Sequence, residues 1–579
     1  MDLVDSAFTP VEIISHMQEY LSDCILSALD AMGGAPKGFT PEFEQPANPE
    51  HGDLSCNAAM QLARHFRKSP RMIAEDVVGH LHALPMDATH IASVEVAGPG
   101  FLNFRFAEAH LADQLAAILD AGASYGRSEE GHGQKAMVEF VSANPTGPLT
   151  VGHGRNAVLG DSIATLLEWA GYDVTREYYF NDAGRQMRIL GESVRARYLA
   201  LVDPDLPTKE IGEGEDLLTV PEPFPEDGYR GDYINEIARD LLDSDGADLD
   251  GAGNPDVFKQ AAEKAIFADI ERTLNRLGIR MDSFFNERSL YESNRVWDIV
   301  DELPSKGLVY DKDGAVWFKT TEFGKDADTV LVKSTGEPTY RLPDIGYHAD
   351  KLDRGFDLCV DVFGADHIAT FPDVLDGIRS LGYDAEKVDV VIYQFVTLVR
   401  GGQPVKMSTR KATYVTLDEL MDEVGEDVTR YFFLMRSPNT HLEFDLDLAK
   451  EASDKNPVFY LQYAHARICS ILRKAEETGL AASANADLSL LEHPSEQGLI
   501  KVMMDLPEII ANAAAQREPH RVSNYLRDVA VAFTQFYGNC RIIGEATELA
   551  EARLSLALAA KQVLHNGLSV LGLSAPERM

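Results

Sequence analysis

The segment from Val138 to Arg155, VEFVSANPTGPLTVGHGR, runs from a short β-branched and aromatic strand through a Gly/Pro-rich loop into a helix. A second strand is predicted at 174–180, which completes a strand–loop–helix–strand unit. In such a unit the free N–H groups and the aligned peptide dipoles at the helix start attract an anion. Gly152 and Gly154 would let that anion approach the backbone, and His153 can donate a hydrogen bond to a phosphate oxygen. The segment therefore predicts a nucleotide-binding site.

A second candidate motif, Lys-Met-Ser-Thr-Arg-Lys at 406–411, follows an apolar strand-like run and the pair Gly401-Gly402. It precedes a helix with a predicted capping box between Thr416 and Glu419. Taken alone, the Gly-His-Gly triplet would more often be an ordinary tight turn. Together, the two motifs resemble the HIGH and KMSKS elements of class I aminoacyl-tRNA synthetases.

The wider sequence is similar to one family of that class, the arginyl-tRNA synthetases. The resemblance covers nearly the whole chain and is carried by PANPEHGDLSCNAA (46–59), GPGFLNF (98–104), SANPTGPLTVGHGR (142–155), NDAGRQ (181–186) and SAPERM (574–579). It implies an arginine:tRNA ligase that converts L-arginine and ATP to arginyl-adenylate and pyrophosphate, then transfers arginine to the 3′ adenosine of arginine tRNA. Mg²⁺ is expected to enter bound to ATP, with no structural metal. Two other interpretations remain open: another nucleotidyltransferase with a GxH loop, and a catalytically impaired synthetase-like tRNA-binding protein.

The sequence departs from the class pattern at two positions. Thr150 stands in place of the first histidine of HIGH, and Thr409 in place of the second lysine of KMSKS. No catalytic role is carried over to either threonine. By resemblance the catalytic residues are His153, Lys406 and Ser408. The ATP site adds Gly152, Gly154, Asp366, His367 and Met407.

A substrate guanidinium requires carboxylates, because its paired N–H donors match a carboxylate fork. By resemblance, Glu139 and Asp344 contact the guanidinium, Tyr340 packs and hydrogen-bonds, and Asn144 contacts the amino-acid backbone. For Glu139 the alternative is an exposed strand carboxylate. Thr370 replaces a glutamine that is usual in the family, which puts that contact in doubt.

The segment VFGADHIAT at 362–370 places Asp366 and His367 at a turn after an apolar strand. An acidic residue at such a strand end commonly accepts hydrogen bonds from ribose hydroxyls. A turn aspartate that bonds its own backbone is the alternative. The resemblance favours a ribose and adenine site.

The chain has 579 residues, 45% of them hydrophobic, which is enough for several globular domains. Its five cysteines are scattered singly, so no zinc cluster or disulfide framework is expected. No signal segment or membrane span is evident, and a cytoplasmic monomer without membrane or DNA partners is expected.

A net charge of −40 argues against binding a phosphate backbone, unless the acidic residues are concentrated elsewhere. Residues 201–250 hold 16 acidic and three basic side chains, a balance of −13. Residues 451–579 hold 15 acidic and 12 basic side chains, a balance of −3. The acidic stretch is predicted to be a loop-rich, solvated surface, so the C-terminal region remains free to present a basic patch.

The C-terminal region is predicted to be helical throughout, with Leu461, Ala464, Ile468, Ile471 and Leu472 on one face of a helix. Tyr460, Tyr463 and Arg467 lie on another face, where aromatic and basic groups could stack bases and neutralise phosphates. The edge of a core is the alternative for this tyrosine stripe. By resemblance these three residues bind tRNA.

The expected fold is α/β, with a doubly wound Rossmann-type catalytic domain. Residues 1–110 are predicted to form an additional α/β tRNA-binding domain, ending in a strand-like stretch at 91–106. The catalytic domain is placed at 130–395, with an acidic insertion at about 195–300. A connecting segment with the KMSKS-like loop follows at 396–450, and an all-α anticodon-binding domain at 451–579.

Overall fold

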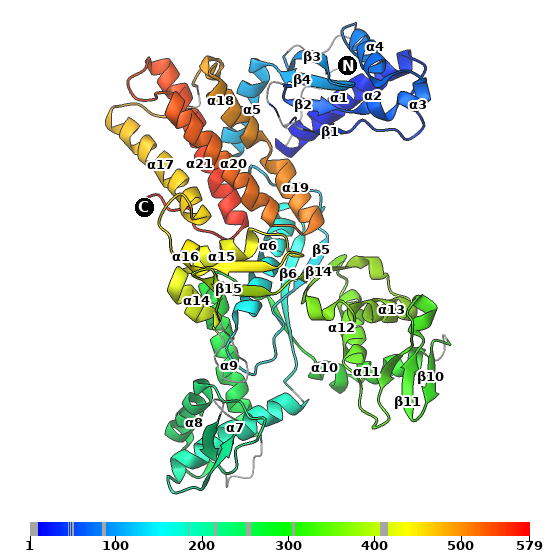
Figure 1. Cartoon of the computed structure of the whole chain (residues 1–579), viewed down its shortest axis with the longest axis vertical. Coiled ribbons are helices and arrows are strands. Elements are labelled where there is room, and N and C mark those ends of the chain that lie inside the picture. The colour runs from blue at the N-terminus through cyan, green and yellow to red at the C-terminus, as the bar shows by residue number, and fades with distance from the viewer. Residues whose placement is uncertain are drawn as a thin grey trace.

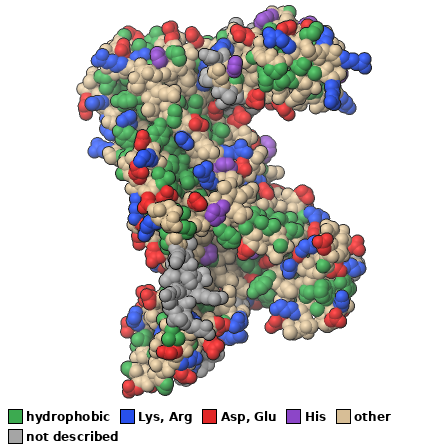
Figure 2. Space-filling view, in the orientation of Figure 1, with side chains coloured by type: hydrophobic (Ala, Val, Ile, Leu, Met, Phe, Trp, Pro, Cys, Tyr) green, Lys and Arg blue, Asp and Glu red, His purple; other side chains and the backbone are tan. Residues whose placement is uncertain are grey.

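The computed structural model describes most of the chain, and its ranges are residues 10–44, 46, 48, 51–83, 89–182, 184–212, 217–249, 256–303, 307–405, 415–483 and 485–579. The predicted motif at 406–411 lies outside the described residues. Figure 1 shows the N-terminal domain and the C-terminal helices at one end of the molecule, and helices α7 (Gly184–Val202) and α8 (Asp232–Asp245) at the other. The surface is hollowed between the N-terminal domain and the lobe at lower right, which contains residues 288–353 (Figure 2). No described helix has the length and apolar composition needed to span a membrane.

A parallel sheet of five strands lies at the centre of the molecule. Its order is β14 (Val388–Tyr393), β13 (Leu358–Gly364), β5 (Lys135–Glu139), β6 (Asp173–Phe180) and β9 (Ser283–Asn286). The chain therefore builds outward from β5 in one direction and returns to build in the other. This is the doubly wound arrangement, in which ligands bind beyond the carboxyl ends of the strands where the order reverses. The predicted α/β fold class is confirmed.

Helix α6 (Val151–Trp169) follows β5 and covers one face of the sheet. It begins in a capping box between Thr150 and His153, and it is buried along most of its length. Gly171 follows it with φ 87°, a left-handed conformation that commonly ends a helix. Helix α12 (Arg341–Asp353) covers the opposite face, because its side chains reach β5, β6 and β13.

The segment between β6 and β9 forms a compact insert of α7, a hairpin of β7 (Thr208–Ile211) and β8 (Leu218–Pro221), α8, and α9 (Val257–Arg276). We call residues 184–276 the α7–α9 insert. The prediction of a loop-rich surface was wrong here, because Ile234, Ile237 and Ala238 of α8 are buried in the main core. The predicted limits of about 195–300 also differ from the structure. They enclose β9, which pairs with β6 in the central sheet.

A further lobe, which the sequence did not predict, separates β9 from β13. It contains α10 (Arg288–Glu292), α11 (Arg295–Glu302) and an antiparallel sheet of β10 (Val309–Lys312), β11 (Ala315–Phe318) and β12 (Thr329–Val332). Phe318 and Leu331 from this sheet join Leu342 and Ile345 of α12 in one hydrophobic core. Helix α13 (Phe371–Leu381) packs beside α12 in the same lobe (Figure 1). The lobe thus fixes the helix that covers the sheet.

The N-terminal domain has its own hydrophobic core. It contains α1 (Pro10–Ala31), α2 (Ala58–Gln61), α3 (Ala63–Phe66), α4 (Pro70–Leu81) and a sheet of β1 (Phe43–Glu44), β2 (Leu54–Cys56), β4 (Phe101–Phe106) and β3 (Ile91–Ala97). The strand-like stretch predicted at 91–106 is two antiparallel strands. They are joined by a turn in which Gly98 and Gly100 take positive φ. Helix α5 (Glu108–Ala121) leads from this domain toward the C-terminal helices.

The chain after β14 forms a small sheet and then a helical bundle. The sheet consists of β15 (Val396–Arg400), β16 (Gln403–Pro404) and β17 (Leu442–Asp445), flanked by α14 (Leu417–Val424), α15 (Glu426–Leu434) and α16 (Leu446–Ala449). The bundle consists of α17 (Pro457–Glu477), α18 (Pro494–Met504), α19 (Leu506–Gln516), α20 (His520–Asn539) and α21 (Thr547–Val570). The predicted apolar face of α17 is buried, with Leu472 only partly so.

Three carboxylates lie side by side within the central sheet. Strand register pairs Asp361 of β13 with Glu139 of β5, and Glu139 with Glu177 of β6. All three side chains are buried. Adjacent strands lie about 4.8 Å apart, so this row concentrates negative charge in a region with little water. The row requires cations from a neighbouring element.

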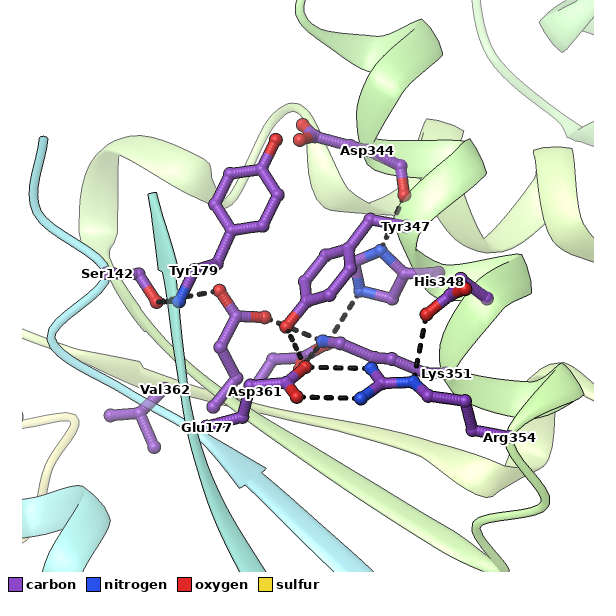
Figure 3. A network of polar contacts seen from close by, with 12 residues as sticks. Ser142, Glu177, Tyr179, Asp344, Tyr347, His348, Lys351, Arg354, Asp361 and Val362 are labelled. Carbon is purple, nitrogen blue, oxygen red and sulfur yellow. Dashed lines mark hydrogen bonds and ion pairs between the residues drawn. The ribbon is translucent and has the colours of Figure 1, made fainter. Parts of the chain in front are cut away.

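Helix α12 supplies those cations (Figure 3). Lys351 Nζ lies 2.6 Å from both Glu139 Oε2 and Asp361 Oδ1. Arg354 donates two hydrogen bonds to Glu177, and Tyr347 donates a third. Burial alone would lower the pKa of Lys351, but the two carboxylates raise it, so its ammonium stays charged. One ammonium facing two carboxylates leaves Glu139 with a raised pKa, because burial and Asp361 both disfavour its ionised form.

Replacing Lys351 by Met should destabilise the sheet strongly, because it leaves Glu139 buried without a counter-charge and Asp361 with only His348 Nε2, at 2.7 Å, as a partner. Breaking such a buried pair typically costs about 3–5 kcal/mol. Urea unfolding followed by circular dichroism would measure the loss. Lys333→Met is the matched control, because the Lys333 ammonium pairs with Glu337 at the exposed surface. Equal urea midpoints for the two variants would contradict this account of the row.

Candidate active site at the carboxyl edge of the central sheet

A cavity of about 410 Å³ opens beyond the carboxyl ends of β5, β6, β13 and β14. It lies at the point where the strand order reverses. The predicted site residues that line it are Glu139, Asn144, His153, Tyr340, Asp344, Asp366 and His367. Thr370, the position that departs from the family pattern, also lines it. Residues widely separated in the sequence are therefore brought into one cavity.

His153 has a defined role as a hydrogen-bond donor. The backbone N–H of Thr150 donates to His153 Nδ1 at 3.1 Å, so Nδ1 is an acceptor and carries no proton. Burial lowers the pKa of the imidazole, which favours the neutral ring. The remaining nitrogen, Nε2, therefore carries the proton. Thr150 does not replace the missing histidine charge. Instead, its backbone N–H fixes the tautomer of His153.

The two glycines of the triplet differ in their surroundings. A side chain at Gly154 would clash with Leu417 and Phe433, since its Cβ would lie 2.6 Å and 3.0 Å from their nearest atoms. Gly154 therefore permits close packing of α6 against α14 and α15. A Cβ at Gly152 would meet only Thr150 Oγ1, at 3.8 Å. Of the two, only Gly152 leaves backbone open to a ligand.

The loop after β5 is strained. Val141 and Ser142 have φ values of 65° and 43°, which β-branched and other L residues rarely adopt. Asn156 of α6 supports this conformation. Its Oδ1 accepts from the Val141 N–H at 2.6 Å, and its Nδ2 donates to the Val362 carbonyl at 2.8 Å. Strained backbone of this kind is concentrated at ligand sites, where surrounding contacts hold it.

Asp344 presents an unpaired carboxylate to the cavity (Figure 3). Burial raises its pKa to about 7, and the negative charges of Glu139 and Glu287 add to the effect, whereas His348 and Lys351 oppose it. Its backbone carbonyl accepts a hydrogen bond from His348 Nδ1 at 2.8 Å. No described residue donates a hydrogen bond to its side chain. A cation that entered the cavity would therefore gain most at Asp344.

Glu139 differs from Asp344 because it already has partners. Its Oε2 pairs with Lys351, and its Oε1 accepts a hydrogen bond from Ser142 Oγ at 2.9 Å. The alternative of an exposed strand carboxylate was wrong, since the side chain is only 3% exposed. Glu139 thus lines the cavity but has less capacity than Asp344 to accept new donors.

Asn144 and Tyr340 are both exposed residues of the cavity lining. Asn144 Oδ1 accepts from the Asn181 N–H, and its Nδ2 donates to Gln186 Oε1, both at 3.1 Å. These two bonds fix the orientation of its amide. Tyr340, at the start of α12, is 87% exposed. Its ring stands at the rim of the cavity, where a ligand could cover it.

Asp366 and His367 lie in the helical turn after β13. The His367 ring stacks on Phe363 with ring centroids 4.9 Å apart. The Asp366 carboxylate is largely exposed, and its nearest ionic partner is His367 Nε2 at 3.8 Å. No described donor from its own turn bonds the Asp366 carboxylate, so the structure gives no support to the self-bonded turn alternative.

The α12 residues that hold the sheet carboxylates were not predicted from the sequence. Asp344, His348, Lys351 and Arg354 recur at helical spacing, and the last three pair with β6 and β13. A polar stripe on a helix normally faces solvent, so this spacing alone would not have revealed the site. The signal that could have found it was a set of carboxylates inside apolar strands.

The start of α14 returns to the candidate site after the segment that the structure leaves undescribed. Thr416 forms a β-bridge with Thr150, and the Leu417 N–H donates to the Leu149 carbonyl at 2.8 Å. The predicted capping box between Thr416 and Glu419 is present. The roles of Lys406, Met407 and Ser408 fall outside the described residues. Within the described part of the chain, no cluster of His, Cys, Asp or Glu is arranged to hold a metal.

A second cavity, of about 850 Å³, lies on the helical bundle between α17, α20 and the chain end. Tyr463 and Arg467 line it, together with Tyr537. Arg467 lies over the Tyr463 ring at 4.6 Å and the Tyr537 ring at 5.4 Å. The acidic Glu577 and four further basic residues also line it: Arg473, Lys474, Arg541 and Arg578. Tyr460 does not line it, and its hydroxyl contacts Thr534.

Comparison with known proteins agrees with this arrangement. Residues 17–106 match the arginyl tRNA synthetase N-terminal domain, 114–441 the class I tRNA synthetase (R) catalytic domain, and 461–579 the DALR anticodon-binding domain. Arginine–tRNA ligase of Salinibacter ruber is 60% identical over 97% of this chain and all of its own length. Arginine–tRNA ligase of Desulfotalea psychrophila is 49% identical over 98% of this chain and all of its own.

A solved structure shows the same fold. Arginyl-tRNA synthetase of Thermus thermophilus superposes with a TM-score of 0.73 at 23% identity, covering 97% of this chain and all of its own. The three family models account for the N-terminal domain, the doubly wound sheet and the helical bundle. This chain belongs to the arginyl-tRNA synthetase family of class I aminoacyl-tRNA synthetases.

Proposed function

We propose that this chain activates arginine with ATP in the cavity at the carboxyl edge of the sheet and transfers it to the 3′ adenosine of arginine tRNA. The observation that carries the proposal is Asp344, a partly buried carboxylate without a described hydrogen-bond donor, which shares a cavity with the His153 donor at the start of α6. The Asp344 carboxylate suits a cationic side chain, and the His153 donor at the helix start suits a polyphosphate.

In this proposal Asp344 binds the guanidinium, which cannot lose its proton and matches a carboxylate fork. Glu139, at the end of β5, contributes the second carboxylate and is held in place by Lys351 and Ser142. Tyr340 covers the bound side chain from the rim. Asn144, oriented by Asn181 and Gln186, contacts the amino-acid backbone.

ATP is proposed to place its phosphates at the start of α6, where Gly152 leaves the backbone open and His153 Nε2–H can donate. Asp366 accepts from the ribose hydroxyls, and His367 lies beside the adenine. Lys406, Met407 and Ser408 are proposed to approach the phosphates from the segment joined to Thr416. Mg²⁺ would arrive bound to the ATP phosphates.

The reaction needs positioning rather than a protein nucleophile. An oxygen of the arginine carboxylate forms a bond to the α-phosphorus as the bond from that phosphorus to pyrophosphate breaks. Negative charge builds on the phosphate oxygens, where the helix N–H groups and His153 can stabilise it. A hydroxyl of the terminal adenosine of tRNA then attacks the mixed anhydride and releases AMP.

The impaired-synthetase alternative is less consistent with this site. Loss of catalysis would relax the need for the strained Val141–Ser142 backbone and for the unpaired charge of Asp344, yet both are present. The backbone N–H of residue 150 holds His153 whichever side chain stands there, so the threonine alone does not indicate lost function. Arginine-dependent exchange of pyrophosphate into ATP, with and without tRNA, distinguishes the two.

The second cavity, on the helical bundle, is proposed as a groove that binds tRNA. Tyr463 and Tyr537 offer faces for unpaired bases, and the surrounding Arg and Lys side chains offer charge for phosphates. A local basic surface of this kind is compatible with the net charge of −40. We further propose that the chain acts as a monomer in the cytoplasm, where its substrates are found.

Arginine binding should weaken as the pH falls below 7. The Asp344 pKa of about 7 means that the carboxylate is ionised above pH 8 and increasingly protonated below pH 7. Only the ionised form pairs with a guanidinium, so the Kd should rise roughly tenfold per pH unit below the pKa. Calorimetric titrations from pH 5.5 to 8 would measure this, with Asp344→Asn expected to bind weakly and without that slope. A parent Kd that is constant over this range would contradict the proposed role.

The same carboxylate should select the substrate. Asp344→Asn should lower kcat/KM for arginine by on the order of 10²- to 10³-fold, because a buried guanidinium loses its counter-charge, while ATP binding changes little. The parent should reject citrulline, which is neutral, and lysine, which lacks the forked donors. Asp353→Asn, an exposed carboxylate on the same helix, is the matched control. Efficient charging of lysine by the parent would refute the assignment.

Tyr463→Ala and Arg467→Ala should each weaken tRNA binding without altering the dissociation constants for ATP and arginine. Stacking of a base is worth about 1–3 kcal/mol, so Kd for tRNA should rise on the order of tenfold. Arg272→Ala, at an exposed arginine of α9, provides a control for the loss of one surface charge. Filter binding would give the Kd for tRNA of all three variants. Unchanged binding by both Tyr463→Ala and Arg467→Ala would mean that the tyrosine stripe of α17 is only the edge of a core.

A further inference from the structure

The α7–α9 insert contacts the loop that joins β5 to α6. Tyr233 of α8 donates a hydrogen bond from its hydroxyl to the Thr146 backbone carbonyl at 2.7 Å. Gln186 of α7 accepts one from Asn144 at 3.1 Å. Thr146 lies between Asn144 and Thr150, so both bonds reach the loop that connects the proposed arginine contact to the proposed phosphate contact.

The loop is shaped to receive the tyrosine. A Cβ at Gly147 would lie 3.0 Å from the Tyr233 hydroxyl and 3.2 Å from the adjoining ring carbon. A Cβ at Gly231 would lie 2.3 Å from the same ring on the insert side. The absence of side chains at both positions allows the ring to approach the loop backbone.

The central sheet holds only the beginning of this loop. Tyr178 of β6 donates from its hydroxyl to the Ala143 carbonyl at 2.7 Å. Farther along, the Thr146 N–H donates to the Asn144 carbonyl at 2.7 Å, which forms a tight turn within the loop. The Thr146 carbonyl is held from outside the sheet, by the insert.

The charge of the insert disfavours a direct role in binding tRNA. Its acidic stretch, residues 201–250, has a balance of −13, which would repel a phosphate backbone. Its side chains nevertheless reach the active-site loop. This combination favours an effect on the chemical step over an effect on tRNA affinity.

We infer that the α7–α9 insert positions the active-site loop, with Tyr233 and Gln186 as positioning residues for arginine activation. The inference rests on the proposed function. Tyr233 holds the Thr146 carbonyl, and Gln186 fixes the Asn144 amide, so together they set where the arginine carboxylate lies relative to the phosphate site. Small misplacements of reacting groups reduce the rate substantially, even when they arise away from the reacting atoms.

The test compares Tyr233→Phe with Tyr198→Phe. The Tyr198 hydroxyl also donates to a backbone carbonyl, that of Gly246 at 2.5 Å, but both groups lie inside the insert. Both variants lose a hydroxyl from the insert, and only Tyr233→Phe removes a hydrogen bond to the loop. We expect Tyr233→Phe to lower kcat about 5- to 10-fold in arginine-dependent pyrophosphate exchange, with the Kd for tRNA unchanged. Tyr198→Phe should retain kcat within about twofold.

A second variant tests the same contact from the loop side. Gly147→Ala should push the Tyr233 hydroxyl away, and adding Tyr233→Phe to it should cause little further loss, because both changes break one contact. Parent-like kcat for Tyr233→Phe, an equal loss for Tyr198→Phe, or additive losses in the double variant would each overturn the inference. Failure of the parent to use arginine would instead refute the proposed function, since the inference depends only on ratios to the parent.

Discussion

A single ammonium group, that of Lys351, allows two of the three carboxylates in the row to lie next to each other inside the central sheet. Without it, the register of β13 and β5 would place like charges together in a dry interior. Its presence also fixes α12 over the sheet, since Lys351, Tyr347 and Arg354 all reach across to strands. Asp344 lies two turns earlier on that helix and receives no such partner. Neutralising the row thus leaves one negative charge at the place where a cationic ligand can reach it.

The parts of the fold that follow from local patterns were predictable from the sequence. Helix α6, its ending near Gly171, the capping box at Thr416 and the apolar face of α17 depend on residues close together in the chain. Several predicted site residues also line the cavity, and Glu139, Asp366 and His367 among them lie at strand ends or in turns of distinctive composition. Their roles came from resemblance rather than from spacing.

The remaining features depend on contacts between distant residues. Lys351 and Glu139 are 212 positions apart, and no local pattern indicates that they form a pair. Strand β9 was not predicted, because it is short and follows a long acidic stretch. The end of the insert, predicted from composition, was therefore placed too far along the chain. Composition also misrepresented the insert itself, because an excess of charge on the surface of α8 does not prevent its other face from being buried. Gly154 illustrates the same limit: the sequence cannot distinguish a glycine that admits a ligand from one that admits a neighbouring helix.

The hydrogen bond from the Thr150 N–H to His153 has a consequence for water. An imidazole whose Nδ1 is occupied can donate from Nε2, but it cannot take up a proton without losing that bond. His153 is therefore unsuited to activate a water molecule as a general base. A reactive mixed anhydride held beside it is spared one route to hydrolysis. The backbone N–H at position 150 thus protects the intermediate, because it leaves His153 able to stabilise charge but not to activate the water that would hydrolyse the product of the first step.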